Sequence, residues 1–149
     1  MDEAITVIAE GLKGLNNAAV DLIAKGEYDE AEKMFKTAEE TSRLFSYGSG
    51  VGMVRVSLAN LSIMRGNVLD ALTHIEVATE FYPPGCDREE ACALQRKISF
   101  MALETGIEKE RSGDLKGALE LFERTLPWLN EKRALMVTEE IARIKQYLK

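Results

Sequence analysis

The fold of this chain is decided by three segments that each run from a glycine to an alanine: Gly26-Glu27-Tyr28-Asp29-Glu30-Ala31, Gly66-Asn67-Val68-Leu69-Asp70-Ala71 and Gly113-Asp114-Leu115-Lys116-Gly117-Ala118. A bulky apolar residue follows each alanine by four positions, and a small residue follows it by seven: Phe35, Ile75 and Phe122, then Ala38, Ala78 and Thr125. Glycine ends a helix where φ is positive, and an acid or amide after it suits the start of the next helix. Each segment therefore predicts two antiparallel helices that cross closely at the alanine. Such hairpins cannot cover their own apolar faces, so we expect them to stack.

Apolar residues elsewhere recur at steps of three and four, which is typical of amphipathic helices. The first stripe consists of Ile5, Ile8, Leu12, Leu15, Ala19 and Leu22. We expect seven helices and no strand, with Asp2 and Asp87 as helix caps and breaks at the three turn glycines, Ser46–Gly50, Pro83-Pro84-Gly85 and Pro127. The glycine-rich run 48–52 is expected to be a connector between helices, since it lacks the spacing of a phosphate-binding loop.

The repeated segment resembles the second half of a tetratricopeptide repeat, Gly-Asp-Tyr-x-x-Ala-x-x-x-Phe-x-x-Ala, over most of residues 12–126. Small residues expected in the preceding helices and the closing proline are also present: Ala19, Leu58-Ala59, Gly106 and Pro83. The family's tryptophan is absent, and the glycines lie 40 and 47 residues apart rather than about 34, which is similar to variants with longer helices. The resemblance implies an all-α, right-handed superhelix of about three hairpins in one domain, 1–149. Its repeats are about 3–46, 50–83 and 87–127, with a capping helix at 130–148. A non-repeating helical bundle is the alternative.

The resemblance also implies a concave groove lined by the first helix of each hairpin. Counting back from the turn glycines places these residues in it: Lys13, Asn16, Val20, Met53, Val56, Asn60, Met64, Arg96, Phe100 and Leu103. Ala24, Ser57, Glu104 and Ile107 fall on the same face. The mixture of methionine, phenylalanine and a few polar anchors suits an amphipathic or extended peptide better than an acidic C-terminal tail. Alternatively, Met53, Met64 and Phe100 close the core.

Charge and cysteine content exclude several classes of protein. The net charge of −6 resides in the first 40 residues, and no cluster of lysine and arginine suggests nucleic acid as a partner. No apolar run reaches the ~20 residues of a membrane span, and the acidic N-terminus does not resemble a secretory signal. Cys86 and Cys92 match neither a redox pair nor a zinc site. We therefore expect a cytoplasmic protein with reduced thiols and without contact to membranes.

The sequence contains no set of residues that predicts catalysis, a metal site or a cofactor. His74 is the single histidine, which excludes a multi-histidine metal site, and a half-buried structural role beside Asp70 is the simpler hypothesis. We expect a non-catalytic module that binds a protein or peptide in the groove. One alternative is a homodimer formed through the long first and last helices. The other is a small helical ligand sensor, which would need a pocket uniting His74, Asp70 and another acid.

Overall fold

The three glycine turns have the same backbone structure. Gly26, Gly66 and Gly113 have φ of 79°, 75° and 91°. In each turn the glycine amide donates to the carbonyl three residues back, and the next amide donates to the carbonyl five residues back, over 2.8 to 3.1 Å. This pair of hydrogen bonds is the Schellman ending of a helix, which requires a left-handed residue at the glycine position. The predicted turns are therefore confirmed.

A computed structural model describes residues 3–81 and 89–149 of the chain. These residues form α1 (Glu3–Ala24), α2 (Tyr28–Leu44), α3 (Gly48–Met64), α4 (Val68–Phe81), α5 (Glu89–Arg111), α6 (Leu115–Thr125) and α7 (Glu131–Tyr147). A short 3-10 turn, Leu126–Trp128, carries Pro127 between the last two helices. The described residues contain no strand, so the prediction of an all-α fold with seven helices is confirmed. The predicted caps Asp2 and Asp87, the Pro83–Gly85 break and Cys86 lie outside the described residues.

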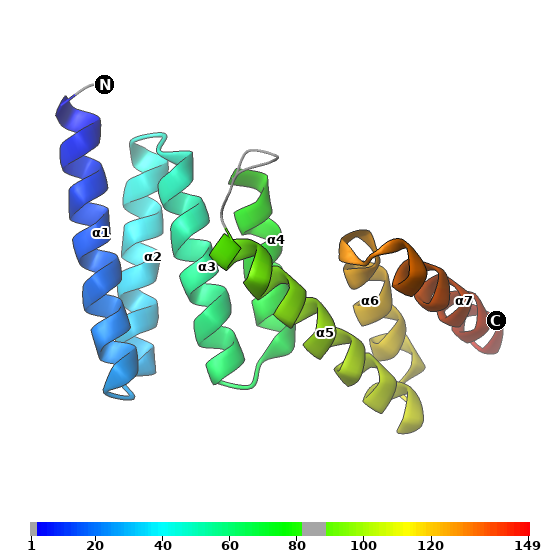
Figure 1. The fold of residues 1–149 in the computed structure, drawn as a ribbon. Helices are drawn as coiled ribbons and strands as arrows, with labels where there is room; N and C mark the ends of the chain where they lie inside the picture. Colours follow the sequence, from blue (N-terminus) through cyan, green and yellow to red (C-terminus); the bar gives the residue numbers. More distant parts are fainter. Residues whose placement is uncertain (1–2, 82–88) are drawn as a thin grey trace. The chain divides into compact units, whose positions relative to one another are not determined.

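The chain divides into two compact units, Met1–Arg88 and Glu89–Lys149. In the N-terminal unit, helices α1 to α4 lie side by side with alternating direction (Figure 1). Contacts join each helix of this unit to the next, and α1 also packs against α3. In the C-terminal unit, α6 packs against both α5 and α7. Each unit is therefore built from antiparallel neighbours with short connections.

The repeated positions are the buried centres of the hairpins. Each of the alanines at the crossings, Ala31, Ala71 and Ala118, has no exposed surface. The bulky residues one turn later are exposed by at most 2%, and the small residues that follow are fully buried: Phe35, Ile75 and Phe122, then Ala38, Ala78 and Thr125. The sequence pattern thus identified these core positions in all three hairpins.

The small residues in the first helix of each hairpin permit close contact between helices. Ala19 and Ala59 are fully buried. At Gly106, a Cβ atom would lie 2.6 Å from the ring of Phe122, well inside van der Waals contact. Glycine is therefore needed at this point because the Phe122 ring of α6 occupies the space where a side chain on α5 would begin.

The prediction of a connector at residues 48–52 is wrong, because α3 already begins at Gly48. The α2–α3 turn occupies only residues 45–47, where Ser46 takes a φ of 54° and makes the same kind of helix ending as the glycines. Gly50 lies in the first turn of α3, where a Cβ atom would meet the side chains of Ser42 and Tyr47. The glycines therefore let the start of α3 approach the end of α2, instead of forming a loop.

Candidate interaction surface

None of the ten predicted groove residues is buried. Six of them are exposed: Lys13, Val20, Asn60, Met64, Arg96 and Phe100. The other four are partly buried: Asn16, Met53, Val56 and Leu103. Met53 packs against the core of the N-terminal unit, so the alternative of a core role applies to it. Met64 and Phe100 do not close the core in this way, since 51% and 50% of their surfaces are exposed.

In the N-terminal unit a hydrogen bond joins the two first helices. Ser57 on α3 donates through Oγ to Oδ1 of Asn16 on α1 over 2.9 Å. These residues are 41 positions apart, close to the 40 positions between Gly26 and Gly66. Equivalent parts of the first two hairpins therefore lie next to each other, with α1 and α3 in register.

In the C-terminal unit the first helix borders an open apolar cleft, which we call the α5–α7 cleft. It has a volume of about 860 Å³, and its walls are α5 and α7. The α5 wall includes the predicted residues Phe100 and Leu103 together with Glu104 and Ile107. Phe122 of α6, which is almost fully buried, lies at the base of the cleft. The structure thus brings these four residues of the predicted groove together in one cavity.

The second wall comes from α7, which sequence reasoning treated only as a cap. Arg133 lies over the ring of Phe100 at 5.9 Å, and Arg143 pairs with Glu110 and with Glu140. Both contacts between α5 and α7 join residues 33 positions apart, so the two helices run parallel in a fixed register. The sequence analysis missed the α7 residues Arg133, Met136, Val137, Glu140 and Arg143 of this cleft, and also Glu110 and Arg111 on α5. The sequence signal for these α7 residues is the amphipathic pattern of residues 131–147, but no turn glycine follows it from which their register could be counted.

The end of the α5–α7 cleft near Phe100 carries two arginines that form no ion pair with a described side chain. A smaller pocket of about 430 Å³ shares Phe100 and Arg133 with the cleft and also includes Arg96 and the exposed Cys92. Asn130 caps α7 there by accepting a hydrogen bond from the amide of Arg133 over 2.9 Å. Among the side chains that the structure describes, no carboxylate pairs with Arg96 or Arg133. This end of the cleft therefore carries two positive charges that lack an acidic partner within the described part of the chain.

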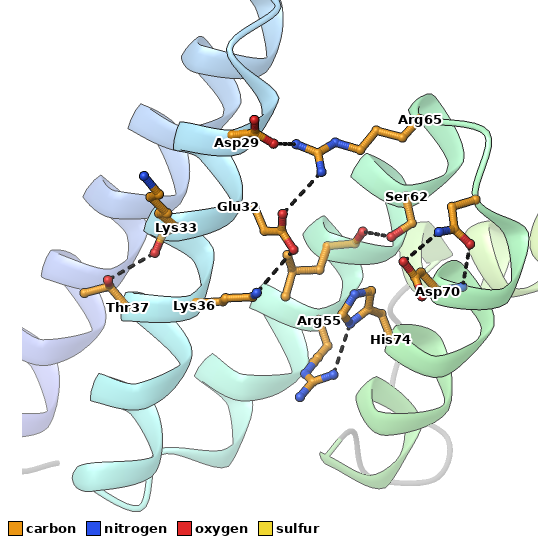
Figure 2. Close-up of polar contacts among 12 residues, drawn as sticks. Asp29, Glu32, Lys33, Lys36, Thr37, Arg55, Ser62, Arg65, Asp70 and His74 are labelled. Atoms are coloured by element: carbon orange, nitrogen blue, oxygen red, sulfur yellow. Dashed lines mark hydrogen bonds and ion pairs between the residues drawn. The ribbon is translucent and has the colours of Figure 1, made fainter.

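A separate polar cluster links α2, α3 and α4 in the N-terminal unit. Arg55 on α3 donates to Glu39 on α2, and its second amino group lies 3.0 Å from Nδ1 of His74 on α4. Figure 2 shows the approach of Arg55 to His74 and, at the C-terminal end of α3, the bonds from Arg65 to Asp29 and Glu32. This cluster ties three consecutive helices together.

His74 has the half-buried structural position expected of it, but its neighbour is Arg55. Asp70, the partner expected from the sequence, accepts a hydrogen bond from the side chain of Asn67 over 2.7 Å. Burial lowers the pKa of His74, and the charge of Arg55 lowers it further, against the smaller opposing effects of Asp70, Glu39 and Glu32. A neutral His74 can accept the Arg55 hydrogen bond at Nδ1.

Burial raises the pKa of Glu39, but hydrogen bonds and charges from Arg55 and Arg43 lower it more, so its pKa lies below the ordinary value. Glu39 is therefore ionised near neutral pH and balances the charge of Arg55. The cluster pairs its charges internally and does not expose a free acid or base.

Within residues 3–81 and 89–149, no three side chains of histidine, cysteine, aspartate or glutamate lie close enough to hold a metal ion. None of the helices in the same part of the chain is both long and apolar enough to span a bilayer. Comparison of the sequence with protein-family models and with curated proteins found no match. The α5–α7 cleft is therefore the candidate site that the geometry itself supplies.

Proposed function

We propose that the chain is a non-catalytic interaction module of the tetratricopeptide type, which binds a peptide or helix of a partner protein on the face of its first helices. The observation that carries the proposal is the α5–α7 cleft, whose bulky apolar residues Phe100, Ile107 and Met136 are exposed. Exposed apolar residues gathered in one concavity are typical of binding sites.

The repeat geometry supports the same proposal. The turns of the three hairpins share one hydrogen-bond pattern, and the 41-residue step from Asn16 to Ser57 matches the 40-residue step between turn glycines. A cytoplasmic location fits the cysteine spacing, which suits neither a disulfide framework nor a zinc site. The proposed module would act by holding its partner, without chemistry of its own.

Two adjacent residues of α7 provide the test. Met136 lines the α5–α7 cleft and Leu135 does not, although 63% and 64% of their surfaces are exposed. Met136→Asp and Leu135→Asp therefore introduce the same charge into the same helix turn at equal exposure. We expect partner proteins captured from an extract of the source cells to be reduced about tenfold by Met136→Asp and unchanged by Leu135→Asp.

Circular dichroism is the check that both variants remain helical, and light scattering measures their mass. Asn60→Ala tests in the same way whether the exposed face of α3 contributes to binding. Equal capture by Met136→Asp and the unaltered chain would show that the cleft is not the binding site. A change of mass caused by Leu135→Asp would instead indicate self-association through α7.

A further inference from the structure

The residues that line the α5–α7 cleft are of two kinds only. Six are apolar and six are charged, and none is asparagine, glutamine, serine, threonine or tyrosine. An extended peptide exposes its amides and carbonyls, which need hydrogen-bond partners when they leave water. Three of the charged residues, Glu110, Glu140 and Arg143, already pair with one another. An α-helix satisfies its own backbone groups, so this lining favours a helical occupant over an extended one.

The length of the cleft agrees with a short helix. Its lining extends from Phe100 to Arg111 on α5 and from Arg133 to Arg143 on α7. At ~1.5 Å per residue this is about 16 Å, or three helical turns. Helix α6, which packs against both α5 and α7, has 11 residues, so the chain itself shows that a helix of this length fits beside the two walls.

The charges at the ends of the cleft differ. At one end the positive charges of Arg111 and Arg143 are balanced by Glu110 and Glu140, whereas Arg96 and Arg133 at the other end have no acidic partner among the described side chains. Helix α7 also begins beside Arg133, and the positive end of its dipole adds to this charge. An occupant with a carboxylate at this end would provide a counter-charge that the described side chains do not supply.

The same dipole argument gives the direction of the occupant. Helices α5 and α7 run parallel, since Phe100 and Glu110 meet Arg133 and Arg143 in the same order. A docked helix that runs antiparallel to them places its negative C-terminal end beside Arg96 and Arg133. Antiparallel packing is also the arrangement that α6 adopts against each of them.

We infer that the α5–α7 cleft binds an amphipathic helix of a partner, antiparallel to α5 and α7, with a carboxylate in its last turn held by Arg96 and Arg133. The inference rests on the proposed function and specifies the partner of that site. The apolar face of the helix, with large residues at i, i+3 or i+4 and i+7, covers Leu103, Ile107 and Met136. The partner is therefore recognised by its secondary structure and by the position of its acid.

Two displayed peptide libraries, each selected for binding to the full chain, test whether the occupant of the cleft is helical. The first presents helix-forming peptides of about 18 residues, with apolar residues varied along one face and either charge allowed at both ends. The second contains the same residues with proline at every third position, which prevents a helix. We expect binders from the first library, with Asp or Glu enriched in the last turn, and their binding lost with Met136→Asp but kept with Leu135→Asp.

Charge variants test the role of the two arginines. Arg96→Gln combined with Arg133→Gln should weaken the selected peptides about tenfold, as measured by fluorescence anisotropy. Arg111→Gln at the opposite end of the cleft is the control and should change the affinity by less than about twofold. Equal weakening by both changes, or by neither, would overturn the assignment of the carboxylate to the arginine end.

The remaining outcomes separate this inference from the proposed function. Binders only from the proline library, sensitive to Met136→Asp, would overturn the helical occupant and leave the interaction function standing. If neither library yields a peptide whose binding is weakened by Met136→Asp, both the helical occupant and the proposed function are overturned. A nitroxide at the peptide C-terminus should broaden amide signals near Arg133, and broadening near Arg143 instead would overturn the antiparallel direction.

Discussion

The two units present their first helices in different ways. In the N-terminal unit, α1 and α3 pack directly together, and the short side chains of Asn16 and Ser57 are hydrogen-bonded between them. In the C-terminal unit, α5 and α7 border an open cleft, and the long side chains of Arg133 and Arg143 reach from one helix to the other. The side chains that bridge successive first helices are therefore short where this face is closed and long where it is hollow.

The sequence separation between contacting residues of successive first helices also differs between the two units. The Asn16–Ser57 hydrogen bond between α1 and α3 joins residues 41 positions apart, and the Phe100–Arg133 and Glu110–Arg143 contacts between α5 and α7 join residues 33 positions apart. The C-terminal step ends in α7, which has no second helix after it within the described residues. The same hairpin pattern thus supports two surfaces, and the following changes test which residues make them different.

The largest expected loss of stability comes from a substitution at the base of the cleft. Phe122→Ala removes a buried aromatic side chain from the core of the C-terminal unit and should lower its free energy of unfolding by about 3–5 kcal/mol. Trp128, the single tryptophan, lies in this unit, so its fluorescence during urea unfolding reports the loss.

Phe35→Ala is the matched change at the same repeat position in the N-terminal unit, where hydrogen exchange of α2 amides measures the effect. We expect a loss of the same size there. A loss below about 1 kcal/mol at either position would mean that the two phenylalanines are not equivalent centres of their hairpins.

The next effect concerns the contact that brings α6 close to α5. Gly106→Ala places a Cβ atom 2.6 Å from the Phe122 ring, so we expect a loss of about 1–3 kcal/mol followed by Trp128 fluorescence. Gly11→Ala in α1 is the control, because no atom lies within 4 Å of its added Cβ. It should stabilise the N-terminal unit by up to about 1 kcal/mol through helix propensity. Stabilisation by Gly106→Ala would contradict the close contact.

Positions that depend on local spacing could be predicted from the sequence. Gly106 was placed at a small position because it precedes Gly113 by seven residues, as Ala59 precedes Gly66. Four residues of the α5 wall followed from the same count. The turn geometry at Gly26, Gly66 and Gly113 follows from local chemistry, since only a positive φ satisfies the helix ending there.

Features that depend on how separate helices are rotated and spaced could not be predicted. The contact of Arg55 with Glu39 and His74 unites three helices at separations of 16 and 19 residues. The start of α3 at Gly48 opposed the local preference of a glycine-rich run for loops, because packing of Gly50 on Ser42 and Tyr47 stabilises the helix there. Met136 was missed because the sequence gives no turn glycine after α7.

A smaller effect is expected where the N-terminal face is closed. Asn16→Ala removes the acceptor of the Ser57 hydrogen bond and should cost about 0.5–1.5 kcal/mol, measured by hydrogen exchange of α1 and α3. Asn17→Ala changes the exposed neighbour of Asn16 on the same helix and is the control. An equal effect of the two substitutions would show that the hydrogen bond does not contribute to packing of α1 on α3.

The smallest expected effect is a difference in pH dependence between the units, because the only histidine of the chain, His74, belongs to the N-terminal unit. Burial and the charge of Arg55 lower the pKa of His74 in the folded state, while the unfolded chain keeps a histidine pKa of about 6.5. As the pH falls through this value, the unfolded state binds a proton that the folded state does not, so stability decreases until the folded pKa is reached. Hydrogen exchange of α3 and α4 between pH 7 and pH 5 should detect this loss, while α6 and α7 show no histidine-dependent change. His74→Gln removes the histidine titration and is the control. If the stability of this variant still falls between pH 7 and pH 5, the pH dependence comes from acidic groups instead. Glu39 is one such group, although its lowered pKa means that its charge is lost in a lower pH range.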